Sequence, residues 1–126
     1  MNFKHGYSKT LFYFGILEFL LGLSGLLFTA LNAQMAGFSE ATYPILKMVG
    51  ALTMAFGYYY IQFGRLEDAN FARLSIHVRL ALTVFWVVMI AMGILPVIMA
   101  GLIVYDLLGA LWTRYELAKH HTQAAA

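Results

Sequence analysis

Three ionisable side chains, Glu18, Arg79 and Asp106, lie within stretches of the sequence that are otherwise mostly apolar. An ionised side chain that faces lipid is costly, by about 2.5–3.5 kcal/mol at the bilayer centre on insertion scales. The least costly arrangement turns all three side chains inward, with Arg79 between the two acids. We therefore expect an intramembrane salt-bridge cluster, which either fixes the packing of the helices or contacts a ligand headgroup, a substrate or a proton.

Further polar residues are predicted to lie at a similar depth. A rise of about 1.5 Å per residue, counted from the nearest basic residue at the membrane edge, places Glu18 about 13 Å, Asp106 about 12 Å and Arg79 about 9 Å into the membrane. The tyrosine run that begins at Tyr58 falls in the same layer. The predicted ligand-binding residues of this layer are Glu18, Arg79, Asp106, Tyr58, Gln62 and His77.

The composition determines which elements must position these groups. The chain has 126 residues, of which 62% are hydrophobic and 11% charged. A soluble domain of this size could not cover so much apolar surface. Four apolar segments are long enough, or nearly so, to cross a hydrocarbon layer of about 30 Å. The sequence therefore predicts an all-α polytopic membrane protein with one domain, residues 1–126, folded as an up-down bundle of four transmembrane helices over roughly residues 9–32, 41–63, 69–93 and 97–117.

Local signals predict how these helices end. Gly64 is suited to close the second helix, and Asp68 or Asn70 to cap the third. Residues 93–96 predict a tight reversal before the last helix. Residues 120–126 are expected to form a disordered tail.

Glycines recur at helical spacing in the first two predicted helices. Small residues on one helical stripe let two backbones approach closely in a membrane. The stripe in the first helix also carries Glu18, so a lining for a ligand cleft is the alternative interpretation. The residues of these predicted helix-packing seams are Gly15, Gly22, Gly25, Gly50 and Gly57.

The distribution of lysine and arginine predicts the orientation. Seven of the eight lie near the two termini, in the second connection or at the start of the third predicted helix, while Lys47 alone lies on the opposite side. Short cytoplasmic connections carry an excess of positive charge. We therefore expect a multi-pass protein with both termini in the cytoplasm and its polar layer in the cytoplasmic half of the membrane.

Several classes of chemistry are not expected. The chain has no cysteine, which excludes disulfides, thiol catalysis and cysteine-based metal sites. It also contains no HExxH motif and no phosphate-binding glycine-rich loop with lysine. His120 and His121 lack a third ligand and do not make a convincing metal site. The sequence thus predicts no enzyme, metal or cofactor, and its small net charge of +2 gives no case for a nucleic-acid partner.

Three functions stay open. The first is a small integral membrane protein that binds an amphiphilic ligand, such as a lipid or a quinone-like molecule, or a membrane partner through the polar layer. The second is proton-coupled transport of a small molecule. The third is a structural accessory subunit of a larger membrane complex. The expected partners are membrane lipid, a hydrophobic small molecule, and a second copy of the chain or a larger membrane complex.

The transport interpretation depends on a short resemblance. The four predicted spans and the segment Gly15-Ile-Leu-Glu18 resemble the small multidrug resistance exporters. The resemblance implies that a membrane glutamate would couple protons to cationic drugs. This chain departs from that family in its strong charge bias and in Arg79, which would hold Glu18 charged and unsuited to proton exchange.

Overall fold

The computed structural model describes residues 2–125, which fold entirely into helices and short connections. The elements are α1 (Gly6–Leu27), α2 (Thr29–Ala36), η1 (Glu40–Thr42), α3 (Tyr43–Arg65), α4 (Ala69–Ala91), η2 (Val97–Met99) and α5 (Ala100–Ala125). Three segments are long and apolar enough to cross a membrane, namely Gly6–Leu27, Ala69–Ala91 and Val97–Ala125. The predicted all-α class is confirmed, and the three segments indicate a multi-pass membrane protein, but five α-helices do not confirm the predicted count of four.

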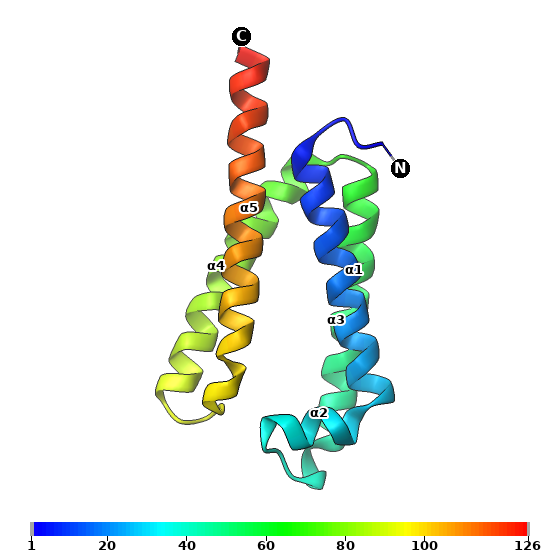
Figure 1. The fold of residues 1–126 in the computed structure, drawn as a ribbon, viewed down its shortest axis with the longest axis vertical. Coiled ribbons are helices and arrows are strands. Elements are labelled where there is room, and N and C mark those ends of the chain that lie inside the picture. Colours follow the sequence, from blue (N-terminus) through cyan, green and yellow to red (C-terminus); the bar gives the residue numbers. More distant parts are fainter. Residues whose placement is uncertain (1, 126) are drawn as a thin grey trace.

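The long helices form two pairs. α1 runs antiparallel to α3, and α4 runs antiparallel to α5 (Figure 1). The two pairs meet at the end that holds the N-terminus and the α3–α4 connection, and they separate toward the opposite end (Figure 1). The side chains of the hydrophobic core cluster, among them Leu11, Ala72, Ile76 and Leu117, gather at the end where the pairs meet. The two helix pairs therefore share one core at one end of the molecule.

The first predicted helix, residues 9–32, is broken at Phe28, where the backbone leaves the helical region with φ −119° and ψ 43°. The side chains that follow bond to the last carbonyl groups of α1. The Thr29 hydroxyl donates to the Gly25 carbonyl at 2.7 Å, and the Asn32 amide donates to the Ser24 carbonyl at 3.1 Å. Such local bonds compete with the helical ladder. The prediction of one continuous helix was therefore wrong, and α2 turns away from the axis of α1 (Figure 1).

The C-terminal residues were expected to be disordered, but α5 continues to Ala125. The start of this extension contacts the residue that precedes α1 and a residue of α4. The His120 ring lies 4.3 Å from the His5 ring, measured between centroids, and His121 Nε2 lies 2.8 Å from Arg73 Nη2. The prediction of disorder was therefore wrong for residues 120–125, the part of the tail that the structure describes.

Glycines line the contact between α1 and α3. A Cβ atom added to Gly22 would lie 2.5 Å from the Gly50 carbonyl oxygen, and one added to Gly15 would lie 2.8 Å from the Gly57 carbonyl oxygen. Gly64, predicted to close a helix, is instead inside α3, and a Cβ there would lie 3.0 Å from the Ser8 carbonyl oxygen. At these glycines the backbones of α1 and α3 thus approach so closely that a side chain would collide with main-chain atoms of the opposite helix.

Asp68 caps α4, as one of the two predicted candidates. Its carboxylate accepts from the backbone N–H groups of Asn70 at 2.8 Å and Phe71 at 3.0 Å. Replacing Asp68 with alanine should lower the free energy of unfolding by about 1 kcal/mol, because two N–H groups lose their acceptor. Chemical unfolding in detergent micelles measures this change. The Asp68→Asn variant keeps a capping oxygen and should retain most of the stability; equal losses in both variants would contradict the capping role.

Candidate functional site

Arg79 of α4 lies at the centre of the shared core and is 1% exposed. Its guanidinium carbon is 3.7 Å from the centroid of the Phe14 ring and 4.8 Å from that of the Tyr60 ring. Arg79 Nε donates to the Tyr60 hydroxyl at 3.4 Å, and Nη1 donates to the Thr113 hydroxyl at 3.2 Å. One side chain thus contacts α1, α3 and α5 together, and a cation over aromatic rings is stabilised by the negative faces of those rings.

The hydrogen bonding of Arg79 is incomplete. Its Nη2 atom is buried and has no hydrogen-bond partner among the described residues. A guanidinium group carries five N–H donors, and a buried donor without an acceptor retains its desolvation penalty. Arg79 is therefore a buried cation with donor capacity still unused.

Two threonines extend the polar contact from Arg79 toward α1. The Thr113 hydroxyl donates to the Gly109 carbonyl at 3.0 Å and so accepts from Arg79. The Thr10 oxygen lies 2.9 Å from the Thr113 oxygen and 2.7 Å from the Tyr7 carbonyl, so its single proton serves one of them at a time. This chain of hydroxyls joins α1 to α5 beside the guanidinium.

The two predicted acids lie near this layer without pairing with Arg79. Asp106 is 7% exposed, and its Oδ2 atom accepts from Trp86 Nε1 at 3.0 Å. Glu18 is half-buried, one helical turn beyond Phe14, and lies beside Tyr105. Within residues 2–125, the contact within 4.0 Å between a carboxylate and a basic side chain joins His5 and Glu67. The intramembrane salt bridge predicted for Arg79 is thus not shown, and aromatic rings and hydroxyls surround the cation instead.

Two of the other predicted site residues are exposed and do not contribute to this buried cluster. Tyr58 is 53% exposed on the outer face of α3. His77 is also exposed and lines a separate hollow of about 460 Å³ with Arg73 and Arg114. Gln62 is half-buried on α3. The structure therefore brings Arg79, Asp106 and Glu18 to one region but leaves Tyr58 and His77 away from it.

The tyrosine run was predicted to lie in the polar layer, but Tyr58 rather than Tyr60 was named as a ligand-binding residue, although the glycine spacing favours Tyr60. Tyr60 lies three residues after Gly57 and four before Gly64, so helical periodicity puts it on the face that the glycines turn toward α1. Thr113 lies seven residues after Asp106 and shares its helical face in the same way. The helical face on which each residue lies, rather than its depth in the membrane, could therefore have identified both as candidate site residues.

A groove between α1 and α5 lies next to this polar layer. It encloses about 420 Å³, and its walls are mostly apolar and aromatic. The residues that line it are Thr10, Tyr13, Phe14, Leu17, Tyr105, Leu108, Gly109 and Trp112. Two of these also adjoin Arg79: Phe14 through its ring, and Gly109, where a Cβ atom would lie 3.2 Å from Nη1. The groove and the buried cation therefore share a wall.

This arrangement suits an elongated molecule with an apolar portion. Pockets between the helices of a bundle are common sites for small ligands, and a few polar groups within an apolar lining orient such a ligand. Comparisons of the chain with protein-family models, with curated proteins and with solved structures give no match.

Proposed function

We propose that this protein is a four-span membrane protein that binds an amphiphilic membrane molecule, a lipid or a quinone-like compound, in the groove between α1 and α5. The proposal depends on one observation. The side chains that line the apolar groove on one side also contact a buried guanidinium that has an unused hydrogen-bond donor. Apolar chains would pack against Leu17 and Leu108 and against the aromatic rings that line the groove.

The position of α3 supports four spans rather than three. α3 falls outside the three candidate spans because its sequence is rich in glycine and tyrosine, which contribute little hydropathy. It is nevertheless 23 residues long, about 34 Å at the helical rise, and its glycines lie against the backbone of α1. A bilayer that surrounds α1 must therefore surround α3 too. The clustering of basic residues favours both termini on the cytoplasmic side.

Filling the groove should remove the bound molecule. Leu108 lines the groove and is 61% exposed, so tryptophan at this position would occupy groove volume without entering the core. We expect Leu108→Trp to lower the amount of co-purifying amphiphile at least severalfold, as quantified by mass spectrometry of protein purified in mild detergent.

The matched control is Leu111→Trp. Leu111 is on the same helix and 48% exposed, but it does not line the groove. This variant should retain the wild-type complement of bound molecules. If both tryptophan variants carry as much amphiphile as the wild type, binding in this groove is wrong.

A further inference from the structure

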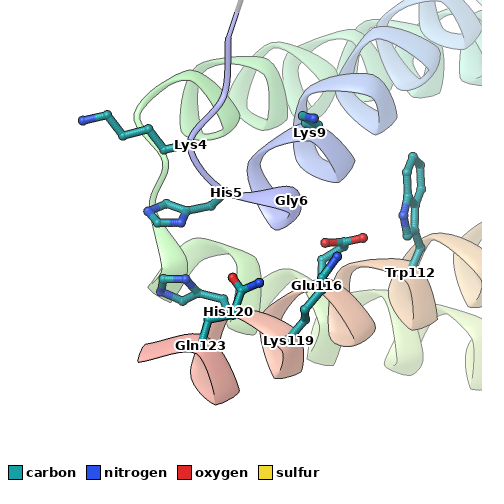
Figure 2. Close-up of a pocket in the computed structure, with 9 residues that line it drawn as sticks. All are labelled: Lys4, His5, Gly6, Lys9, Trp112, Glu116, Lys119, His120 and Gln123. Carbon is teal, nitrogen blue, oxygen red and sulfur yellow. The ribbon is translucent and has the colours of Figure 1, made fainter. Parts of the chain in front are cut away.

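A second hollow lies at the end of the molecule where the helix pairs meet. It encloses about 300 Å³ between the start of α1 and the C-terminal half of α5 (Figure 2). Three lysines, Lys4, Lys9 and Lys119, line it together with Glu116 and two histidines. We call this hollow the lysine pocket.

The lysine pocket is electropositive. Three lysines less one glutamate give its lining side chains a formal charge of +2 with the histidines neutral. None of these lysines makes an ion pair within 4.0 Å to a residue that the structure describes. The first turn of α1 also opens here, with no acidic residue in that turn and no side-chain cap from His5. The unpaired N–H groups and positive dipole end of a helix start favour an anion.

The carboxylate of Glu116 already places one negative charge at the start of α1. Its carboxylate lies directly against Gly6, the first residue of α1, and a Cβ atom at Gly6 would collide with it. Figure 2 shows Glu116 between Gly6 and the Lys119 side chain. One carboxylate offsets only one of the three lysine charges, so the pocket retains capacity for a further anion.

The lysine pocket continues into the apolar groove. Trp112 lines both, and Lys9 of the pocket precedes Thr10 of the groove in sequence. Tryptophan is enriched where the hydrocarbon region meets the headgroup region. The basic residues, the interfacial tryptophan and the apolar groove therefore follow one another along the α1–α5 surface. A lipid has its charged headgroup and its apolar chain in the same order.

We propose that the lysine pocket binds the phosphate-bearing headgroup of an anionic phospholipid whose acyl chain occupies the α1–α5 groove. This inference rests on the proposed function and names its ligand class. Basic pockets beside transmembrane helices bind anionic headgroups, and each lysine near the surface adds to the attraction. A soluble phosphate compound would offer the same anion without the chain, and the experiment below separates the two.

The test compares the binding of phosphatidylglycerol and phosphatidylcholine to the full-length protein in mild detergent by native mass spectrometry. The wild type should bind phosphatidylglycerol more tightly, and the triple variant Lys4→Gln, Lys9→Gln, Lys119→Gln should lose roughly a hundredfold of that preference. The triple variant with arginine at the same positions keeps the charge and should keep the preference. A control variant, Lys47→Gln, Arg65→Gln, Arg114→Gln, removes as many charges from exposed positions outside the pocket and should also keep it.

Each other outcome is informative. An unchanged preference in the lysine-to-glutamine variant, with its unfolding midpoint equal to that of the wild type, overturns the headgroup assignment. Displacement of phosphatidylglycerol by inorganic phosphate alone identifies a soluble-anion site and overturns the lipid assignment. If both lipids bind equally and Leu108→Trp displaces both, the headgroup inference fails while the proposed function stands. If neither lipid binds, the headgroup inference fails, and the co-purification experiment with Leu108→Trp and Leu111→Trp decides the proposed function.

Discussion

Replacing Gly57 with alanine is expected to lower the free energy of unfolding by roughly 3 kcal/mol, the upper end of what overpacking usually costs. The new Cβ atom would lie 2.8 Å from the Gly15 carbonyl oxygen and against the backbone of Phe19. Both neighbours are main-chain atoms of α1, so no side-chain rotation can make room. The α1–α3 pair would have to separate along its length. Unfolding by SDS in mixed micelles measures the loss.

Gly101→Ala is the matched control for this prediction. Gly101 is also helical, in α5, but no atom lies within 4 Å of the position where its Cβ would be. Alanine favours a helix over glycine by up to about 1 kcal/mol. This variant should therefore be neutral or slightly stabilised. If the Gly57→Ala protein is as stable as the Gly101→Ala protein, the backbones of α1 and α3 lie farther apart than in the structure.

Replacing Arg79 with alanine should lower the free energy of unfolding by about 3–4 kcal/mol. A buried cation over an aromatic ring contributes about 2 kcal/mol or more, and removal of a large buried side chain adds the cost of a cavity. Arg79 contacts Phe14, Tyr60 and Thr113, which belong to three different helices. The loss should therefore weaken the association of the two helix pairs more than either pair itself. Distances between spin labels placed on α1 and α4 report this separation directly.

Arg73→Ala provides the comparison within the same helix. Arg73 is exposed, and its polar contacts are with Asn70 and His121 at the surface. Exposed interactions of this kind contribute about 0–1 kcal/mol. A similar loss in both variants would mean that Arg79 acts through general charge rather than through the core that it occupies. Arg79→Lys should fall between the two, because an ammonium group keeps the charge but lacks the planar stacking surface.

Composition and local spacing were sufficient for the class and for several details of this protein. The apolar content predicts a helical membrane protein, and the structure shows helices apolar enough to span. Asp68 could be named as a cap because a cap depends on the two or three residues that follow it. Helical periodicity likewise put Gly15, Gly22, Gly50 and Gly57 on stripes that the structure places in backbone contact. Each of these features is decided within one helix or one turn.

Tertiary structure alone decided what surrounds the buried charge. Counting residues gives the depth of Arg79, Glu18 and Asp106, but it does not give the rotation of each helix or the distance between helix pairs. Two close-packed helices, α1 and α3, present Phe14 and Tyr60 to Arg79, and the hydroxyl of Thr113 reaches it from α5. Aromatic faces and a hydroxyl can thus stabilise a cation where the sequence suggested carboxylates. The α1–α5 groove and the lysine pocket follow from the same packing, since both lie between helices that are distant in the sequence.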